Sequence, residues 1–489
     1  MSARPAKRQV AVADLVSAIP DCIAPSTDAV VTGIELDSRQ VESGDLFAAL
    51  PGRQTHGAEH APQALARGAA AILTDARGAG LIGEVAAPII VVPDPRAVLG
   101  MLAAAVYGHP ADALTLLGVT GTNGKTTVSY LLEAGLRAAG HTTGVIGTIG
   151  VRVGDAVIDS ARTTPEAAHT HALLAMMREQ GVDAVAMEVS SIALCEGRVD
   201  GLRFAVAGFT NLSQDHLDYH GTMEAYFAAK AALFTPQRAE LGVVGIDDDW
   251  GRRLAESAPI PVQTWTTVPG RPADWRLVAE PGGWIVHGPE GETQSLVVPL
   301  PGAYNRANAL CAYAMLRAGG VDPARAAAGI AGVTVPGRME VVASVDGITG
   351  IVDYAHSPDA IERVIEAVRE GHPGRIIVVL GAGGDRDREK RPLMGRAARL
   401  ADAVIVTDDN PRSEDPASIR QAVYEGVQGV PARIIPDRRA AIAEAFAQAE
   451  SGDTVLVLGK GHEQGQEIAG VVHPFDDRDA VRAAIGGAR

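Results

Sequence analysis

Residues 120–127 have the composition of a loop that binds the phosphates of a nucleotide. They read Thr-Gly-Thr-Asn-Gly-Lys-Thr-Thr and lie between an apolar run, 114–119, and a helical pattern that ends at Gly140. Glycines let backbone N–H groups converge on phosphate oxygens, and the start of a helix adds partial positive charge. Lys125 would reach the β and γ phosphates of ATP, and the Thr126 hydroxyl would hold Mg²⁺. The candidate ATP-binding residues are Gly121, Thr122, Asn123, Gly124, Lys125, Thr126 and Thr127.

The loop departs from the general P-loop pattern at one position. Val119 stands where G-x-x-x-x-G-K-[ST] requires the first glycine, and the glycines fall at 118, 121 and 124. The alternative interpretation is an ordinary glycine-rich start of a helix. The Lys-Thr pair directly after a buried strand favours phosphate binding.

Three polar residues farther along the chain could complete a metal site. Glu188 ends the apolar run 184–187, which favours a Mg²⁺ ligand beside a phosphate loop over the alternative, a cap on the next turn. His216 and His220 are four residues apart, but the zinc pattern H-E-x-x-H fails because Leu217 replaces the glutamate. From the residues alone, His216 is an ordinary surface or core histidine. Lys230 is likewise an ordinary solvated lysine on a helix capped by Thr222.

Four strand ends near the C-terminus carry polar or glycine-rich loops. These loops are 353–358, 381–387, 408–412 and 459–463, and each follows an apolar run. In a doubly wound sheet, ligands lie beyond the carboxyl ends of the strands. The mixture of Arg and Lys with Asp and Glu suits a ligand that carries both carboxylates and amines. The run Gly-Ala-Gly-Gly-Asp-Arg is not G-x-G-x-x-G, which weakens a dinucleotide oxidoreductase interpretation.

The elements that must position these residues form three zones. A chain of 489 residues is expected to form about three domains. Zone 1–110 has short β-rich runs, and residues 107–110 have the composition of a linker. Zone 111–335 holds the phosphate loop and an expected β-hairpin excursion at 260–300, and a helix at 305–318 closes it. Zone 336–489 alternates apolar runs at 348–352, 375–380, 403–407 and 454–458 with helical patterns, which predicts a doubly wound parallel sheet.

Composition excludes several classes of protein. The 43 basic and 59 acidic residues give a net charge of −16, which argues against nucleic acid as a main partner. No uncharged apolar run reaches the ~18–20 residues of a membrane-spanning helix, and the start lacks the apolar stretch of a signal peptide. Cys22, Cys195 and Cys311 are widely spaced and are expected to be isolated buried thiols. We therefore expect a cytoplasmic protein.

With these motifs in order, the chain resembles the Mur ligases of peptidoglycan synthesis. The resemblance spans nearly the whole chain and is carried by eleven segments: LDSRQVESGDLF, VTGTNGKTT, RTTPE, MEVSS, FTNLSQDHLDYHGTMEAYFAAK, YNRANAL, PGRME, VDYAHSPDA, GGDRDREKRPLM, TDDNPR and GKGHE. The resemblance implies an α/β fold of three domains. The first, 1–110, binds the UDP-sugar; the second, 111–335, is a P-loop ATPase; and the third, 336–489, is Rossmann-like and binds the amino acid.

The resemblance also implies roles for individual residues. Thr126, Glu188 and His216 would serve Mg²⁺, and Lys230 would be carbamylated, since a carboxylate made from CO₂ can bind a metal that an ammonium repels. With Lys125, His216 and Lys230 are the catalytic candidates. Asn305, Arg338 and Asp353 would engage ATP. The residues expected to hold UDP-MurNAc-L-Ala-D-Glu are Ser38, His56, Gly57, Thr163, Thr164, Ser190 and Arg198.

The segment Asp-Asn-Pro-Arg indicates the branch of the family that adds meso-diaminopimelate rather than lysine. Arg412 could bind a distal carboxylate that lysine lacks, and Glu463 could take the ammonium. The residues expected to bind diaminopimelate are Arg386, Asp409, Asn410, Arg412, Gly459 and Glu463. The chain departs from the family after MEVSS, where Ile192 and Glu196 replace the usual His and Gln.

The expected activity is therefore an ATP-dependent peptide synthase that adds diaminopimelate to the γ-carboxylate of D-Glu through an acyl phosphate, acting as a monomer. The rivals are a lysine-adding or folylpolyglutamate-type ligase, and a P-loop switch that hydrolyses ATP only to change shape. The N-terminal LDSRQVESGDLF segment argues against the folate branch. The four charged strand-end loops argue against a switch, because they need a second substrate to explain them.

Overall fold

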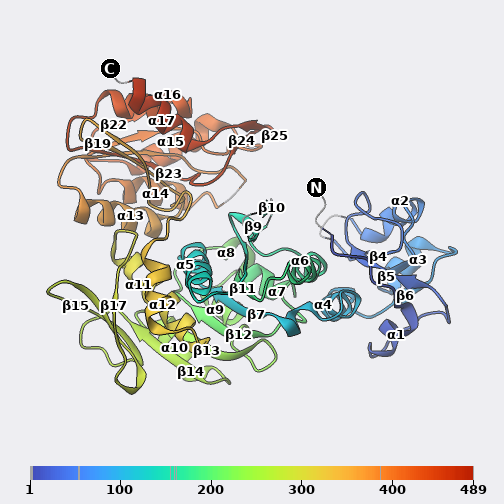
Figure 1. Cartoon of the computed structure of the whole chain (residues 1–489). Helices are drawn as coiled ribbons and strands as arrows, with labels where there is room; N and C mark the ends of the chain where they lie inside the picture. The colour runs from blue at the N-terminus through green and yellow to red at the C-terminus, as the bar shows by residue number, and fades with distance from the viewer. Residues whose placement is uncertain are drawn as a thin grey trace.

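Three main β-sheets follow one another along the chain, as Figure 1 shows. The computed structural model describes residues 4–52, 55–154, 156–158, 160, 162–385 and 387–487. Helices flank each sheet, and most neighbouring strands are parallel. The expected α/β fold is thus confirmed.

The N-terminal sheet has four parallel strands in the order β3-β4-β5-β6. Their bounds are Gly33–Glu35, Asp45–Ala48, Ala71–Thr74 and Ile89–Val91. A separate antiparallel pair is formed by β1, Val10–Ala11, and β2, Val30–Val31. The helices of this part are α1 Val12–Ser17, α2 Ala61–Ala66, α3 Ala76–Ile82 and α4 Pro95–Val106. The strands are almost wholly buried, because helices cover a parallel sheet on both faces.

The central sheet has eleven strands, and the phosphate loop follows one of its inner strands, β7. Their order is β10-β9-β8-β11-β7-β12-β13-β14-β15-β16-β17, parallel from β8 to β15 and antiparallel at both ends. The strand bounds are β7 Thr115–Thr120, β8 Thr143–Gly147, β9 Gly150–Val153, β10 Ala156–Ile158, β11 Ala184–Glu188, β12 Phe204–Phe209, β13 Ala239–Gly245, β14 Val262–Thr266, β15 Trp275–Glu280, β16 Gly283–His287 and β17 Thr293–Leu296. The helices are α5 Lys125–Ala138, α6 Ala167–Glu179, α7 Ser191–Cys195, α8 Leu217–His220, α9 Met223–Ala231, α10 Asp249–Ser257, α11 Ala303–Ala318 and α12 Pro323–Ala331.

The expected hairpin excursion at 260–300 is wrong in one respect. Strands β15, β16 and β17 do form antiparallel pairs, but β14 is parallel to both β13 and β15, so the segment continues the central sheet. Trp265 and Trp275 pair across β14 and β15 and are buried in the same core as α5 and α11. The two indole rings are buried against residues far away in the sequence, and this packing joins the segment to the sheet. Local turn residues do not reveal such distant contacts.

The C-terminal sheet has six strands in the order β18-β19-β23-β20-β21-β22. Only β18, Glu340–Val345, is antiparallel to its neighbour. The other strands are β19 Ile348–Asp353, β20 Ile376–Leu380, β21 Ala403–Val406, β22 Ala432–Ile434 and β23 Thr454–Leu458. The helices are α13 Pro358–Gly371, α14 Lys390–Ala398, α15 Pro416–Gly426, α16 Arg438–Ala447 and α17 Asp477–Gly487, and a hairpin of β24 Gly465–Ile468 and β25 Val471–Pro474 stands apart. All four predicted strands of this sheet are confirmed.

The cysteines differ from expectation. Cys311 is buried, Cys22 is partly buried and Cys195 is exposed, and all three are free thiols. Cys195 is the last residue of the short helix α7, at its exposed end. Among the described residues, no helix combines the length and hydropathy needed to cross a membrane.

The N-terminal part contacts the central part at α4 and α6 (Figure 1), and the ion pair of His169 is among those that join the two parts. His169 on α6 lies 3.2 Å from Glu35 at the end of β3, and Arg4 also binds Glu35 at 3.2 Å. The hydrogen bond to Glu35 raises the pKa of His169 above its ordinary value of 6.5. This stabilisation is fully present below pH 6.5 and is lost as the pH rises through the raised pKa of His169.

We therefore expect His169→Ala to lower the thermal unfolding midpoint at mildly acidic pH more than at alkaline pH. The side chain of His169 is half exposed, so solvent screening keeps the effect below about 1 kcal/mol. Calorimetry of both proteins across this pH range measures the difference. An equal loss at every pH would contradict a role for the charge of His169.

Candidate functional site

The phosphate loop joins β7 to α5 in the way the sequence predicts. Gly121 has a φ of +149° and Gly124 a φ of +91°, which are conformations that other residues rarely adopt. A side chain at Gly121 would collide with the Thr210 hydroxyl, and one at Gly124 would collide with the Asn308 amide. Both glycines are therefore required by backbone conformation and by space.

Lys125 folds back over this loop. Its Nζ donates to the carbonyl oxygens of Gly121 and Thr122, each at 2.9 Å. Burial lowers the pKa of Lys125, while the nearby Glu188 opposes that shift. The two carbonyl groups hold the ammonium at the mouth of the loop, where an incoming phosphate can take their place.

Glu188 is the best prepared oxygen ligand of the site. It is 1% exposed and accepts three hydrogen bonds: from the Thr148 backbone N–H at 2.8 Å, the Thr148 hydroxyl at 2.9 Å and the Thr126 hydroxyl at 3.0 Å. Arg338 donates to the Thr126 hydroxyl at 3.1 Å. A carboxylate and a hydroxyl in contact are suitable ligands for a hard cation such as Mg²⁺.

The four residues predicted to serve a metal do not form a complete cage. Across the described ranges, no three His, Cys, Asp or Glu side chains are grouped closely enough to hold a metal ion. Thr126, Glu188 and His216 line one cavity of about 200 Å³ together with Thr148 and Asp215. The donor set fits Mg²⁺, which usually takes only one or two carboxylates and completes its shell with water and substrate phosphates.

Lys230 is not the solvated lysine that its helix position alone indicates. It is 1% exposed, and its Nζ donates to the Gly121 carbonyl oxygen at 2.8 Å, the same atom that accepts from Lys125. The nitrogen also lies 4.5 Å from the centre of the Tyr226 ring. Burial first, and then the charge of Lys125, hold the pKa of Lys230 well below its ordinary value. The site therefore favours an uncharged amine, which is the form that reacts with CO₂.

His216 begins α8 in the left-handed conformation, with a φ of +53°. Its Nε2 lies 3.5 Å from Asp215, and its ring packs edge-on against Tyr226. Burial lowers the pKa of His216, although Asp215 opposes the shift. A neutral imidazole is the form that can accept a proton or bind a metal.

A second cavity, of about 70 Å³, lies where the central and C-terminal parts meet beside the phosphate loop. Asn305, Arg338 and Asp353 line it together with Tyr304 and Tyr354. The Arg338 guanidinium lies 4.4 Å from the centre of the Tyr354 ring. Asp353 accepts from the backbone N–H groups of Met339 at 2.7 Å and Ala355 at 2.8 Å. The polar rim and aromatic walls suit a nucleoside.

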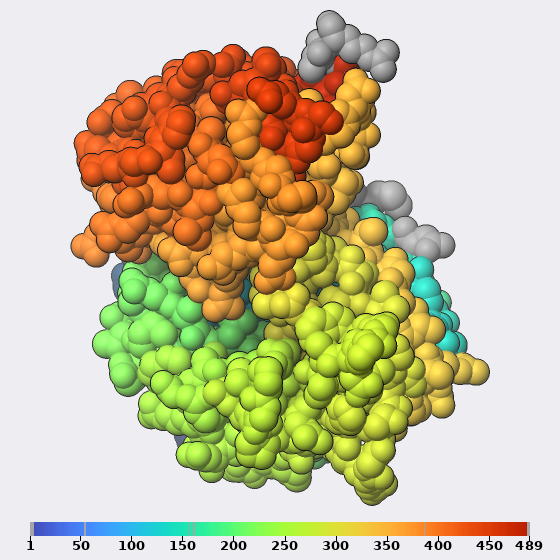
Figure 2. All heavy atoms as spheres, turned by 90° about the vertical axis from the view of Figure 1, so that its left-hand side faces the viewer, coloured from blue at the N-terminus to red at the C-terminus, as the bar shows by residue number. Residues whose placement is uncertain are grey.

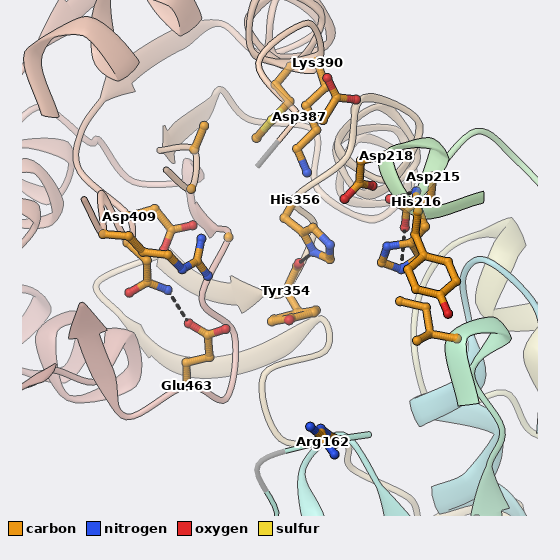
Figure 3. Close-up of a pocket in the computed structure, with 18 of the residues that line it drawn as sticks. Arg162, Asp215, His216, Asp218, Tyr354, His356, Asp387, Lys390, Asp409 and Glu463 are labelled. Atoms are coloured by element: carbon orange, nitrogen blue, oxygen red, sulfur yellow. Dashed lines mark hydrogen bonds and ion pairs between the residues drawn. The ribbon is translucent and has the colours of Figure 1, made fainter. Parts of the chain in front are cut away.

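A larger cleft of about 570 Å³ separates the central part from the C-terminal part, and Figure 2 shows the molecule hollowed there. In Figure 3, Asp409 and Glu463 lie on one side of it, Asp215 and His216 lie on the other, and Tyr354 and His356 stand between them. The predicted residues that share this cleft are Arg198, His216, Asp409, Asn410, Arg412, Gly459 and Glu463. The tertiary structure thus gathers five of the residues predicted to bind diaminopimelate in one cleft. His216 lines both this cleft and the cavity of the phosphate loop.

Lys460 organises the C-terminal wall of the cleft. It is fully buried, and its Nζ donates to Asp409 at 3.2 Å, Asn410 at 2.9 Å and Glu463 at 3.3 Å. Asn410 also donates to Glu463 at 2.9 Å. Although burial opposes the shift, the Lys460 charge lowers the pKa of Asp409, whereas burial and Asp409 raise the pKa of Glu463. Of the other predicted residues, Arg386 lies outside the described residues.

A third cavity, of about 600 Å³, opens on the N-terminal sheet. Ser38 and Gly57 line it, and the Ser38 hydroxyl donates to Gln63 at 2.7 Å. His56 is turned away: it is 3% exposed, accepts from the Ala58 backbone N–H and lies 3.1 Å from Asp75. His56 therefore shapes the loop that carries Gly57.

Arginines connect this third cavity to the cleft. Arg96 and Arg162 line both spaces, and Glu166, which lies between them, pairs with Arg96 at 3.1 Å and Arg198 at 3.2 Å. Glu196 pairs with Arg96 at 3.3 Å and accepts from Tyr219 at 2.7 Å. Thr163, Thr164 and Ser190 stand nearby, with Thr163 bonded to Thr148 and Thr164 to the Glu188 carbonyl oxygen. Three arginines and two glutamates line the passage, which leaves one excess positive charge and suits an elongated anion.

Sequence reasoning missed several residues of this site: Arg96, Thr148, Asp215, His356, Lys390 and Lys460. His356 and Lys460 lie in the strand-end loops 353–358 and 459–463, so their position in these loops could have indicated that they line the site. Arg96 and Thr148 carry no local signal, because only the packing of distant segments brings them to the cavities.

Known proteins resemble this chain in sequence and in fold. Residues 30–107 match the profile described as "Mur ligase family, catalytic domain", residues 119–316 the "Mur ligase middle domain", and residues 337–461 the "Mur ligase, glutamate ligase domain". The UDP-N-acetylmuramoyl-L-alanyl-D-glutamate–2,6-diaminopimelate ligase of Streptomyces coelicolor is 53% identical over 475 residues, which cover 94% of each chain. The protein of the same name from Corynebacterium glutamicum is 48% identical, over 93% of this chain and 92% of that one.

A solved structure of a protein with this name is 33% identical, covers 98% of this chain and 99% of the other, and has a TM-score of 0.67. Both the sequence identity and the coverage extend over all three sheets described above. The chain belongs to the Mur ligase family.

Proposed function

We propose that this protein is an ATP-dependent ligase that adds meso-diaminopimelate to the γ-carboxylate of D-Glu in UDP-MurNAc-L-Ala-D-Glu. The observation that carries the proposal is the 570 Å³ cleft, which sets Asn410, Arg412 and Glu463 opposite His216. The names of the relatives at 53% and 48% identity support it. A phosphate loop beside a zwitterion-binding wall suits the activation of one carboxylate for attack by an amine.

Each of the three parts has one proposed task. Residues 1–110 bind the UDP-sugar, 111–335 bind ATP, and 336–489 bind the amino acid. The proposed contacts of UDP-MurNAc-L-Ala-D-Glu are Ser38, Gly57, Thr163, Thr164, Ser190 and Arg198, while His56 supports the loop that carries Gly57. The positive passage at Arg96 and Arg162 supports this path, because the substrate is an elongated anion.

ATP is proposed to bind with its phosphates on residues 121–127 and its nucleoside near Asn305, Arg338 and Asp353. Mg²⁺, held by Thr126, Glu188 and His216, would neutralise phosphate charge. Carbamylated Lys230 would supply a further anionic oxygen at a place where the unmodified ammonium lacks a counter-ion. Lys125 would stabilise the negative charge of the phosphoryl group during its transfer.

The amino acid is proposed to lie against Arg386, Asp409, Asn410, Arg412, Gly459 and Glu463. Arg412 would bind the distal carboxylate, while Glu463 and Asp409 take the ammonium. Lys460 keeps these acceptors in place, since it bonds to three of their oxygens from a fully buried position.

The reaction has two balanced steps. The γ-carboxylate oxygen attacks the γ-phosphorus of ATP, the bond to the β-phosphate oxygen breaks, and ADP leaves. The amine then attacks the carbonyl carbon of the acyl phosphate, the C–O bond breaks, phosphate leaves, and the nitrogen loses a proton. Because His216 is assigned to Mg²⁺, that proton is proposed to pass to solvent water in the cleft.

The rivals make different predictions. A lysine-adding or folylpolyglutamate-type ligase would use another amino acid, and a P-loop switch would hydrolyse ATP without one. We also propose a cytoplasmic monomer without a nucleic-acid partner, in keeping with the net charge of −16.

A competitive incorporation assay tests the proposal. Purified enzyme receives ATP, Mg²⁺, UDP-MurNAc-L-Ala-D-Glu and equal amounts of meso-diaminopimelate and L-lysine. We expect ADP and phosphate release to be matched one for one by the diaminopimelate tripeptide, with lysine product below about one per cent of the total if Arg412 contributes about 3 kcal/mol of discrimination. Faster addition of lysine, or ATP hydrolysis that needs no amino acid, would refute it.

A further inference from the structure

The hairpin of β24 and β25 is a small sheet of its own beside the amino-acid wall. It has only two strands, and β25 is exposed along its whole length, with Val472 66% exposed. A two-stranded hairpin is at best marginally stable by itself. Its conformation must therefore depend on what its other strand touches.

Strand β24 is bonded to the loop 408–412. Glu467 accepts from the Arg412 backbone N–H at 3.0 Å, and the Ala469 N–H donates to the Arg412 carbonyl oxygen at 2.7 Å. The Glu467 N–H donates to the Asn410 side chain at 2.9 Å, and the Gln466 amide donates to the Asp409 carbonyl oxygen at 2.7 Å. The hairpin and the loop thus form one hydrogen-bonded unit.

This unit holds Arg412 in an unusual backbone conformation. Arg412 has a φ of +52°, in the left-handed region, which costs a residue other than glycine about 1 kcal/mol or more. The two backbone hydrogen bonds to β24 flank this residue on either side. The hairpin therefore stabilises the turn that directs Arg412 into the cleft.

The guanidinium of Arg412 is held as well. Its Nε lies 3.3 Å from a Glu467 carboxylate oxygen, and one terminal nitrogen donates to the Gly384 carbonyl oxygen at 2.6 Å. A guanidinium has five N–H groups, so three remain for a ligand. The Glu467 contact uses the Nε edge, and the free N–H groups lie on the terminal nitrogens.

We propose that Glu467 is a positioning residue for amino-acid selection, and that the hairpin presents Arg412 to the distal carboxylate of the incoming amino acid. This inference rests on the proposed function. The ion pair with Glu467 and the hydrogen bond to Gly384 already restrict the guanidinium. It therefore loses less orientational entropy when it binds a carboxylate. An amino acid that lacks the distal carboxylate gains nothing from this arrangement, so Glu467 contributes to selectivity without touching the substrate.

The test compares Glu467→Ala and Glu467→Gln with the native enzyme. Glutamine keeps the length of the side chain and an oxygen beside Nε but loses the charge of the ion pair, whereas alanine removes the whole contact. We expect Glu467→Ala to raise the KM for diaminopimelate about tenfold with little change in kcat, and Glu467→Gln to raise it by a smaller factor of about threefold. The KM values for ATP and for the UDP-dipeptide should not change in either variant. Glu444→Ala, which removes a partly exposed glutamate that pairs with Arg433 on the same part of the chain, is the matched control.

Three outcomes would overturn the inference: an unchanged or lower KM for diaminopimelate in Glu467→Ala, a parallel rise in all three KM values, or equal defects in the alanine and glutamine variants. Amide hydrogen exchange gives a second readout, since added diaminopimelate should slow exchange in residues 465–474 of the native protein and much less so in Glu467→Ala. No slowing in the native protein would also overturn it. Failure of the proposed function is distinguishable, because the native enzyme itself would then fail to prefer diaminopimelate.

Discussion

Replacing Lys230 with alanine is expected to lower kcat by about 10³-fold, whereas Lys230→Glu is expected to recover part of the activity. The unmodified ammonium is buried beside Lys125, and both donate to the Gly121 carbonyl oxygen. Within the part of the chain that the structure describes, Lys230 forms no ion pair, and among carboxylates only the charge of Asp215 opposes the lowering of its pKa. A carbamate changes this cation into an anionic oxygen ligand, and a glutamate carboxylate imitates it with a shorter reach. Steady-state assays at saturating substrates measure the effect.

The folding of the variants separates catalysis from stability. Lys230→Ala leaves the Gly121 carbonyl oxygen with its hydrogen bond from Lys125, so the thermal unfolding midpoint should not fall below that of the native protein by more than a degree or two. Lys7→Ala, at an exposed lysine, controls for loss of positive charge and should keep full activity. Equal activity in the native, alanine and glutamate forms would contradict the carbamate.

Carbon dioxide provides a direct readout of the same idea. Burial lowers the pKa of Lys230 well below its ordinary value, which increases the fraction of unprotonated amine, and the unprotonated amine is the form that adds CO₂. Enzyme freed of CO₂ should regain activity when bicarbonate is added, and Lys230→Glu should not respond. Mass spectrometry of rapidly digested protein, or ¹³C NMR with labelled bicarbonate, should detect the adduct on Lys230.

Arg412→Ala is expected to lower kcat/KM for meso-diaminopimelate by about 10²-fold and to leave the slow addition of L-lysine within about threefold. The reason is the loss of a charge-assisted pair with the distal carboxylate, a group that lysine lacks. The competitive incorporation assay described above measures the ratio of the two products.

Loss of the hairpin contacts could by itself disturb the cleft, and Arg412→Lys controls for this. It keeps the charge but loses the planar fork, so we expect an intermediate preference for diaminopimelate. Arg433→Ala, at an exposed arginine of the same part, should behave like the native enzyme. A parallel loss of both amino acids in Arg412→Ala would contradict a role in selection.

The local sequence pattern was sufficient to predict much of the architecture. The strand before the phosphate loop, the helix after it, the helical cap at Thr222 and four of the five parallel strands of the C-terminal sheet follow from periodicity and turn residues, and the structure has them. The continuation of the central sheet through β14 to β17 did not follow, because it depends on β14 and β15, which carry Trp265 and Trp275, packing against α11. Contacts between distant segments leave no local pattern.

The sequence by itself determined the chemistry available to this protein: a phosphate loop, an isolated glutamate at a strand end, and charged loops at four other strand ends. Only the tertiary structure decided which of these groups meet and in which charge state. Lys230 has the helical setting of a solvated lysine, yet the fold buries it against Gly121 and removes the water that would keep it protonated. His56 lies in a segment assigned to the UDP-sugar, yet it faces Asp75 and caps its own loop. Burial and partnership are properties of the packed chain, because they depend on segments that the sequence places up to hundreds of residues apart.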